Sequence, residues 1–364
     1  MRTMKLFLVF SIVMILVLSS CAQTLTPNAT PITTPKTTPT FTATVMTTTP
    51  TPMPTRAEMI QQLPESQDIV TRQYRWWYAG SEWTWDLPIP QALYDYYKQR
   101  PRPPTKDYSV YVTHPEDDFY LEMLVKEIEE AAVGEGFDEW ETVNFAVSFV
   151  QSLPYTSDTV TTPYDEYPRY PIETLVDYGG DCEDSSILMA AILYEMGYGV
   201  ILLSPPGHMA VGVLGGEGVY GTYWEHNGKK YYYLETIGEG WRIGEIPPVY
   251  ESENAYIYDI VPVPILTHSW QATTQGYYVK LVVTVENWGT ATAYDTYVYA
   301  GFDAGGGTLW SARESQLFDL PSDYSIDATL YLSIPMYKYT RIVVQIIDDG
   351  YAVDESYSEW FDTY

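Results

Sequence analysis

The stretch Gly179-Gly180-Asp181-Cys182-Glu183-Asp184 decides how the central part of the chain folds. Two adjacent glycines let the backbone turn sharply, and Asp181 is a residue type that caps the first turn of a helix. Apolar residues then recur at helical spacing up to Gly197, namely Ile187, Leu188, Ala191, Ile192 and Met196. The pattern predicts a helix that begins near Cys182, buries one face and ends at Gly197.

Cys182 would occupy the first turn of this helix, which affects its chemistry. The helix macrodipole favours a thiolate there, and the backbone N–H groups of the first turn can stabilise an oxyanion. The carboxylates of Asp181, Glu183 and Asp184 act in the opposite sense, because neighbouring negative charge raises a thiol pKa. We therefore expect a cationic partner near the sulfur, and a histidine is the natural candidate.

The segments around this helix predict an α+β arrangement. Two amphipathic helices precede it, around Leu121–Ile128 and Trp140–Val150, and an aromatic hairpin lies before them near Tyr74–Trp85. Four strands follow the helix, at Val200–Ser204, His208–Leu214, Tyr220–Glu225 and Lys230–Thr236. An Asn-Gly pair between the last two favours a type I′ hairpin turn. Such a sheet can bring His208 beside Glu235, giving the order nucleophile, base and orienting carboxylate.

These residues resemble the transglutaminase-like superfamily, the papain-related group that includes microbial cysteine proteases. The resemblance is carried by Gly180–Asp184, Gly207–Val211 and Tyr233–Thr236, and its wider pattern covers residues 70–250. It implies a papain-like catalytic domain in which His208 accepts the Cys182 proton and the thiolate attacks an amide carbonyl. Water or an amine then releases the acyl group, and Glu235 orients His208.

The resemblance leaves several site residues open. The third residue of the superfamily is usually Asp, so Glu235 is a departure, and Asp177 and Glu225 are further candidates for that role. The oxyanion would be held by the Cys182 backbone N–H, with Gln151 or Tyr155 as helpers; otherwise Gln151 ends a helix and Tyr155 is an ordinary ring.

A calcium site is a second expectation at the start of the Cys182 helix. In calcium-dependent periplasmic adhesin proteases that this segment resembles, acidic residues around the cysteine bind Ca²⁺, and Asp181, Glu183 and Asp184 occupy those places. The alternative is that Asp181 caps the helix and the other two match its macrodipole. No cofactor is required by the expected acyl chemistry itself.

The N-terminus has the features of an export signal and a tether. Arg2 and Lys5 precede a short apolar run, Leu6–Leu18, which ends at Leu18-Ser19-Ser20-Cys21. This resembles the lipobox of bacterial lipoproteins, in which the cysteine (here Cys21) is lipidated; the alternative is an ordinary cleaved signal. Residues 22–56 are rich in Thr and Pro, which favours an extended stalk that reaches on the order of 100 Å.

The C-terminal part, from about residue 263 to 364, is predicted to form a small β-sandwich. Val279, Leu281, Val283 and Val285 alternate with less apolar residues, and further short strands follow. Glu286–Ala291 resembles the N-x-G turn of CARDB-like, immunoglobulin-related surface modules. The predicted organisation is therefore a signal peptide (1–21), a disordered linker (22–56), a transglutaminase-like domain (57–262) and a sandwich (263–364).

Composition limits the possible partners. The net charge of −29 repels phosphate backbones, so we expect no nucleic-acid partner. Three functions fit the pattern: a surface peptidase or amidase acting on a protein or peptide, a protein-glutamine transglutaminase, and a non-catalytic binding module that retains the fold. In each case we expect an exported protein held at a membrane by its N-terminal lipid.

Overall fold

The computed structural model describes residues 46–47, 51–52, 68–161, 166–216 and 218–364. The predicted signal peptide and its lipidation site Cys21 lie outside these residues. Among the residues described, no helix is both long enough and apolar enough to cross a membrane. Strands form more of the described chain than helices, and buried side chains gather in a mixed helix–sheet part and in a later all-β part.

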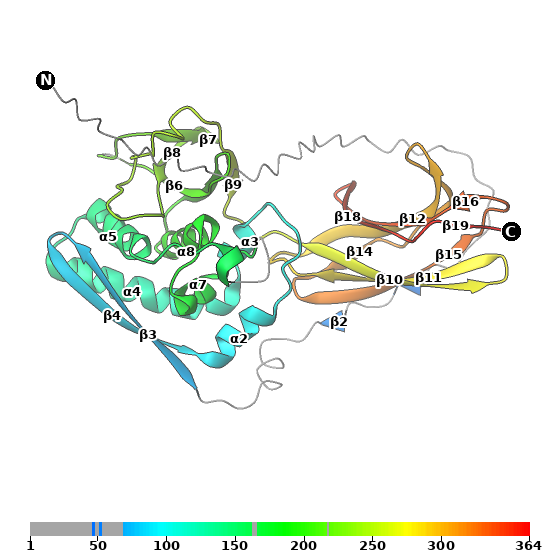
Figure 1. Ribbon diagram of the computed structural model, residues 1–364, viewed down its shortest axis with the longest axis horizontal. Helices are drawn as coiled ribbons and strands as arrows, with labels where there is room; N and C mark the ends of the chain where they lie inside the picture. Colours follow the sequence, from blue (N-terminus) through cyan, green and yellow to red (C-terminus); the bar gives the residue numbers. More distant parts are fainter. Residues whose placement is uncertain (1–45, 48–50, 53–67, 162–165, 217) are drawn as a thin grey trace, which may run out of the picture. The chain divides into compact units, whose positions relative to one another are not determined.

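The helices of the first part surround the one that begins at Cys182 (Figure 1). They are α2 (Gln91–Gln99), α3 (Ser109–Val112), α4 (Asp118–Glu135), α5 (Glu139–Gln151), α6 (Asp158–Thr161), α7 (Pro171–Asp177) and α8 (Cys182–Glu195), with a 3₁₀ turn at Pro115–Asp117. α8 contacts α3, α4, α5 and α7 on its sides and strands β5 and β6 on the sheet. Its residues from Ile187 to Leu193 are buried, so the expected single apolar face is in fact apolar nearly all round.

One antiparallel sheet packs against α8 through its strands β5 and β6. Its strands are β5 (Val200–Ser204), β6 (Ala210–Leu214), β7 (Tyr223–His226), β8 (Lys229–Leu234) and β9 (Tyr256–Asp259), in the order β7-β8-β6-β5-β9. The predicted type I′ turn is confirmed, since Asn227 and Gly228 have φ of 50° and 73°. His208 lies just before β6 and Glu235 just after β8, and the pairing of these two strands brings both residues to one end of the sheet.

The predicted aromatic hairpin is also present. Strands β3 (Ile69–Tyr78) and β4 (Ser81–Pro90) pair along their whole length, and their aromatic rings pack against Phe145 and Phe149 of α5. Two short helices follow α5: α6 at Asp158–Thr161, and α7, which begins with Pro171. Proline is favourable at a first helical position because its missing N–H would have no partner there.

The later part is a sandwich of two antiparallel sheets. The first contains β10 (Leu266–Gln275), β11 (Tyr278–Asn287) and β15 (Tyr324–Ser333); the second contains β12 (Ala293–Gly305), β13 (Thr308–Glu314), β14 (Phe318–Leu320), β17 (Ile342–Asp348) and β18 (Tyr351–Tyr357). A short pair, β16 (Tyr339–Thr340) and β19 (Phe361–Asp362), lies apart. The predicted alternation in β11 is confirmed, because Val279, Leu281, Val283 and Val285 are all buried.

The N-x-G turn of the sandwich depends on one buried amide. The side chain of Asn287 accepts hydrogen bonds from the backbone N–H groups of Ile265 and Gly289 and donates to the carbonyls of Ala291 and Leu320. A Cβ at Gly289 would overlap the backbone of Val263 and Ile265. The asparagine is therefore explained by the hydrogen bonds that it makes to backbone groups, and the glycine by the close approach of the neighbouring backbone.

A hydrogen-bonded clasp joins the edge strands of the two sandwich sheets. His268 on β10 bonds through Nδ1 to Asp354 (2.6 Å) and through Nε2 to the hydroxyl of Ser356 (2.6 Å), both on β18. The indole N–H of Trp270 also donates to Ser356 (2.8 Å). The connectivity is that of a Ser-His-Asp arrangement, with the indole N–H as a further donor, and we interpret it as a structural clasp because its bonds join the two sheets.

The predicted linker is partly ordered, which corrects one expectation. Residues Met46–Thr47 (β1) and Thr51–Pro52 (β2) pair with β15 instead of belonging to a wholly disordered stalk. The exposed edge of β15 offers unpaired backbone groups that an extended segment can satisfy. The remaining stalk residues lie outside the described part of the chain.

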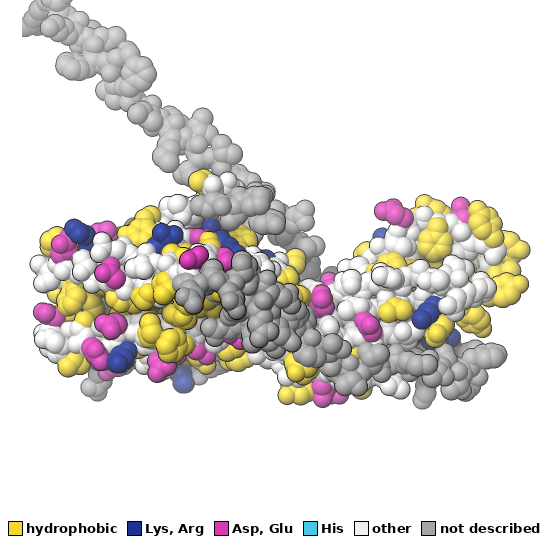
Figure 2. All heavy atoms as spheres, turned by 90° about the horizontal axis from the view of Figure 1, so that it is seen from below, with side chains coloured by type: hydrophobic (Ala, Val, Ile, Leu, Met, Phe, Trp, Pro, Cys, Tyr) yellow, Lys and Arg dark blue, Asp and Glu magenta, His cyan; other side chains and the backbone are white. Residues whose placement is uncertain are grey.

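On the face drawn in Figure 2, acidic side chains are dispersed and form no single patch.

Candidate active site

Cys182 is the first residue of α8, as the sequence predicts. Asp181 is the N-cap residue and forms a reciprocal capping box with Asp184. The two preceding glycines are required by space: a Cβ at Gly179 would overlap the Pro154 carbonyl, and one at Gly180 would overlap the Asp184 carboxylate. Gly179 also has φ of 130°, where a side chain is strained. The turn before the helix therefore explains why this glycine pair precedes the cysteine.

His208 and Glu235 form a close pair. The Nε2 atom of His208 lies 3.2 and 3.1 Å from the two carboxylate oxygens of Glu235. Within the described chain, no group forms a hydrogen bond with the other ring nitrogen, Nδ1. The pairing therefore fixes the imidazole through one nitrogen and leaves the second one for proton exchange.

Glu235 is held in place by several donors. The Tyr233 hydroxyl donates to one oxygen (2.9 Å), and the backbone N–H groups of Thr236 and Ile237 donate to the other (3.0 and 3.1 Å). Burial alone would raise the pKa of this carboxyl, but the hydrogen bond and charge of His208 and these donors lower it. Glu235 is thus a buried, ionised partner of His208. Its side chain, longer than that of the usual Asp, reaches the imidazole as predicted.

The thiol of Cys182 is close to the backbone beside His208 but carries a proton. The N–H of Met209, the residue after His208, faces the sulfur and favours the thiolate. However, Sγ donates a hydrogen bond to Glu183 (2.9 Å). Burial of the thiol, followed by the charge and hydrogen bond of Glu183, raises the pKa of Cys182 far above its ordinary value. The acidic neighbours therefore act on the thiol in the direction expected from the sequence, and burial adds to their effect.

Gln151 is not placed as an oxyanion donor. Its side chain is buried, and its Nε2 donates both hydrogens to backbone carbonyls, those of Glu235 (2.8 Å) and Trp241 (3.0 Å). Its Oε1 accepts from the N–H of Gly240 (3.1 Å). The amide therefore braces the segment that carries Glu235 and has no hydrogen left for a substrate oxygen.

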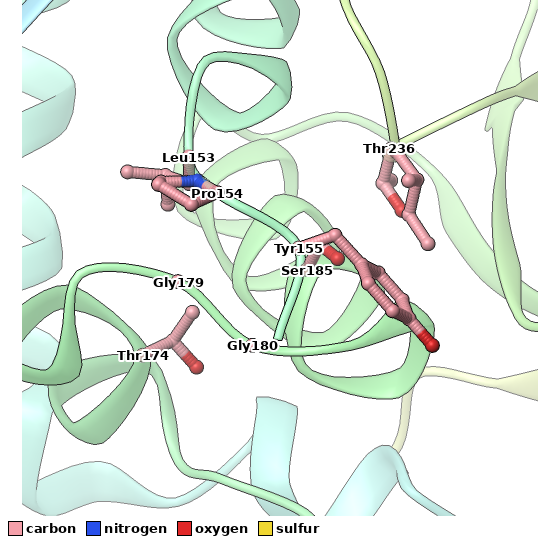
Figure 3. A pocket seen from close by; sticks show the side chains of 9 residues that line it. Leu153, Pro154, Tyr155, Thr174, Gly179, Gly180, Ser185 and Thr236 are labelled. Carbon is pink, nitrogen blue, oxygen red and sulfur yellow. The ribbon is translucent and has the colours of Figure 1, made fainter. Parts of the chain in front are cut away.

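Tyr155 lies beside the turn that leads to Cys182. Its backbone forms a parallel bridge with Gly180, and 57% of the residue is exposed. It borders a small hollow, which Figure 3 shows with Tyr155 and Thr236 on one side and Thr174 and Gly179 on the other. Tyr155 is thus available at the surface near the thiol, and its role as an oxyanion donor stays a prediction.

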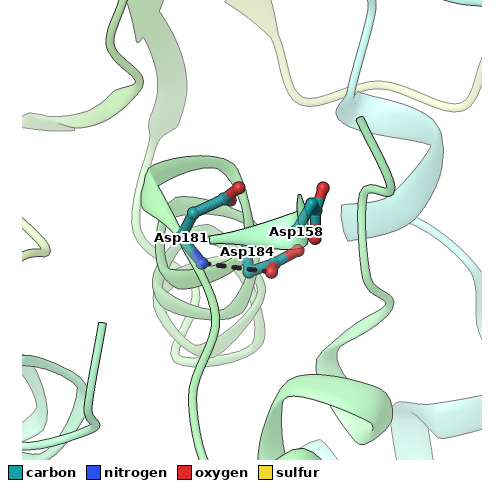
Figure 4. Close-up of side chains that lie close together, drawn as sticks. All are labelled: Asp158, Asp181 and Asp184. Atoms are coloured by element: carbon teal, nitrogen blue, oxygen red, sulfur yellow. Dashed lines mark hydrogen bonds between the residues drawn. The ribbon is translucent and has the colours of Figure 1, made fainter. Parts of the chain in front are cut away.

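The acidic residues at the start of α8 are arranged differently from the calcium expectation. Glu183 faces the thiol, whereas oxygens of Asp158, Asp181 and Asp184 lie within 4.8 Å of one another (Figure 4). Burial raises the pKa of Asp181, and the charges of Asp184 and Glu183 raise it further.

Arg169 supplies positive charge to this acidic cluster. Its buried guanidinium bonds to Asp158 (2.9 Å), to Asp177 (3.2 Å) and to Asp184. Together with the backbone N–H of Arg169, the guanidinium engages both carboxylate oxygens of Asp184, one of the three residues expected to bind calcium. The calcium site itself stays a prediction.

The other carboxylate candidates lie elsewhere. Asp177 bonds to Tyr94, Lys98 and Arg169. Glu225 is exposed on β7, opposite Lys230. Neither of them contacts His208, so Glu235 alone of the three candidates forms the pair.

Two features of the site were not predicted from the sequence. The ring of Tyr250 stacks in parallel on the imidazole of His208, with centroids 4.8 Å apart and planes 5° apart. Arg169, 1% exposed, neutralises the acids beneath the first turn of α8. No periodic pattern marks either residue; the only available signal for Arg169 is a lone cation in a Tyr/Pro/Asp-rich segment.

Comparisons with known proteins give partial likenesses only. No family model matches the chain, and no curated protein matches it in sequence. The CARDB domain of a Pyrococcus furiosus protein, solved with di-metal ions, is 17% identical over 28% of this chain and 86% of its own, with a TM-score of 0.20. A DUF3823 family protein from Bacteroides ovatus is 12% identical over 46% of this chain and 89% of its own, with a TM-score of 0.22. Red sea bream transglutaminase is 10% identical over 83% of this chain and 64% of its own, with a TM-score of 0.23.

Proposed function

We propose that the chain is a cysteine-dependent acyl-transfer enzyme with a transglutaminase-like, papain-related catalytic part, acting as a peptidase or amidase. The observation that supports this most strongly is the His208–Glu235 pair beside the helix that starts at Cys182. A buried carboxylate holds the imidazole through Nε2, and the sulfur lies against the backbone of Met209, next to that imidazole. The base and its orienting carboxylate are therefore paired, and contact of the Cys182 thiol with His208 is the part that we propose.

The proposed reaction has two halves. In the first, Nδ1 of His208 accepts the thiol proton and Sγ attacks the carbonyl carbon of an amide, giving an oxyanion near the Cys182 N–H. The C–N bond then breaks, and the leaving amine takes the proton from His208. In the second half, water attacks the thioester and passes a proton to His208, the C–S bond breaks, and the sulfur regains a proton.

The proposed reaction also requires that the thiol leave Glu183. In the arrangement described above, the Cys182 proton points to that carboxylate. A rotation about the Cys182 side chain would exchange this contact for one with His208. We therefore expect a resting enzyme whose thiol is protonated and whose activation accompanies substrate binding.

Acyl-enzyme trapping tests the proposed function without knowledge of the natural substrate. The full chain carrying Cys21→Ser is mixed with p-nitrophenyl acetate, and intact mass is followed with time. We expect an acetyl group on Cys182 that turns over, no acetylation in Cys182→Ala, and a large loss of rate in His208→Ala. Equal acetylation rates in the parent and in His208→Ala would contradict a general-base role for His208.

A protein-glutamine transglutaminase is the second candidate. The charges of Glu183 and Asp181 act on the thiol, and negative charge at this position would attract a protonated amine acceptor. Adding a labelled primary amine to the acyl-enzyme separates the two activities: label in the product supports transfer, whereas free acid supports hydrolysis. A binding module that only retains the fold would show neither acylation nor turnover.

We further propose that the protein is exported, lipid-anchored through Cys21, and acts on a protein or peptide at the cell surface. The proposal rests on the N-terminal segment Arg2–Cys21 and on the acidic composition. Labelling with palmitate is expected in the parent and not in Cys21→Ala. Equal labelling of the two would contradict the anchor.

A further inference from the structure

The buried hydroxyl of Ser186 lies at the junction of the three segments that carry the candidate site residues. Ser186 is in α8, one helical turn after Cys182, and is fully buried. Its Oγ donates to the carbonyl of Met209 (3.1 Å) and lies 3.0 Å from the hydroxyl of Thr236. The carbonyl can only accept, so Ser186 uses its one proton there and accepts the proton of Thr236.

Each end of this chain of bonds meets the residue next to a site residue. Met209 follows His208, and Thr236 follows Glu235 in sequence. The backbone N–H of Thr236 also donates to the Glu235 carboxylate (3.0 Å). Residues one turn apart lie on the same side of a helix. The Ser186 hydroxyl, which bonds to Met209 and Thr236, is therefore on the same side of α8 as Cys182.

Burying the Ser186 hydroxyl costs free energy, which its hydrogen bonds to Met209 and Thr236 offset. The neighbours Ile187 and Leu188 are fully buried, and a buried hydroxyl without a partner is unfavourable. An alanine would fill the same place without that cost. The serine is therefore better explained by the link it makes between elements than by packing.

We propose that Ser186 is a positioning residue, which fixes the register of the Cys182 helix against the strand ends that carry His208 and Glu235. The inference rests on the proposed function and adds a residue that does not touch substrate. A displacement of about 1 Å between reacting groups can reduce a rate by about 100-fold. Loss of the Ser186 bonds should therefore reduce turnover much more than substrate binding.

The experiment compares Ser186→Ala, Thr236→Val and the double variant in the full chain carrying Cys21→Ser. The readouts are kcat and KM for p-nitrophenyl acetate, the rate of Cys182 alkylation by iodoacetamide, and the ¹⁵N chemical shifts of the His208 ring. Ser109→Ala is the matched control, because Ser109 is equally buried and, among the described residues, its hydroxyl has no hydrogen-bond partner.

We expect kcat to fall about 10- to 100-fold in Ser186→Ala, with KM within about threefold and changed His208 ring shifts. Thr236→Val should act in the same direction, and the double variant should lose no more than Ser186→Ala, because the two hydroxyls form one chain. Ser109→Ala should match the parent in all readouts.

The outcomes separate this inference from the proposed function. Parent-like ring shifts and alkylation in both single variants would overturn the positioning role. Changed shifts and alkylation in a protein whose parent never turns over would support positioning and contradict the enzyme. If Ser186→Ala does not fold, Thr236→Val decides, since valine keeps the volume and removes only the hydroxyl.

Discussion

Glu183→Gln should increase the reactivity of Cys182, because it removes the negative charge nearest to the sulfur and keeps the side-chain shape. The carboxylate oxygen and Sγ are 2.9 Å apart. At that separation a unit charge interacts by about 1.4 kcal/mol at the dielectric constant of water and by about 6 kcal/mol at an effective value near 20. These limits correspond to a fall in the Cys182 pKa of about one to four units.

The expected change in rate is smaller than the change in thiolate fraction. At a pH well below the thiol pKa, each unit of decrease raises the thiolate fraction about tenfold. The nucleophilicity of the thiolate falls about threefold per unit at the same time. The alkylation rate of Glu183→Gln should therefore exceed that of the parent by between about threefold and 100-fold at pH 7.5.

The assay is the second-order rate of iodoacetamide alkylation, followed by intact mass from pH 6 to 11 in the Cys21→Ser background. Glu129→Gln, an exposed position on α4, removes the same charge away from the site and should leave the pH profile unchanged. Superimposable profiles for Glu183→Gln and the parent would refute the conclusion that Glu183 holds the thiol proton.

Three further predictions concern the surroundings of the pair. Tyr250→Ala should lower kcat/KM about fivefold through loss of a stack worth about 1 kcal/mol, whereas Tyr250→Phe should retain the rate, as measured with p-nitrophenyl acetate. Gln151→Met should reduce the free energy of unfolding in urea by about 1 to 3 kcal/mol, since the buried Glu235 carbonyl and two less buried backbone groups lose their partner. Asn144→Leu, which loses only a bond within α5, should cost less. The lowered pKa of Glu235 gives stability that is present above its ordinary pKa of 4.5 and lost as pH falls through the lower folded value. The stability difference between the parent and Glu235→Gln should therefore be smaller at pH 3 than at pH 7, and a constant difference would contradict the ionised pair.

The sequence could predict those parts of the fold whose signals are local. The glycine pair and the capping acid locate the start of α8 within one residue, and the Asn-Gly pair determines the β7–β8 turn. Strand β5 also has the predicted limits, Val200–Ser204, because a short apolar run between turn residues has few alternatives. The pairing of β6 with β8 then brings His208 to Glu235, so the central pair follows from topology.

Contacts that depend on side-chain direction could not be predicted in this way. Gln151 ends a helix, as expected, but only the tertiary fold shows that its amide faces the backbone of Glu235 and Trp241. The stack of Tyr250 on His208 comes from an irregular segment with no period. The sequence indicated both influences on the Cys182 pKa, but their balance depends on burial of the sulfur and on the rotamer of Glu183, which no spacing encodes.

Two carboxylates act on the candidate site in opposite ways, and their placement explains how one arrangement could be both quiescent and competent. Glu235 holds the Nε2 side of the imidazole and leaves Nδ1 without a hydrogen bond in the described chain. Glu183 holds the thiol proton at the other side. In the proposed reaction, the Cys182 side chain would turn from Glu183 to His208. A substrate group that binds Glu183, such as an ammonium or an amide N–H, would favour that turn by competing for the carboxylate, so the same contact that suppresses the free thiol would link its activation to substrate binding.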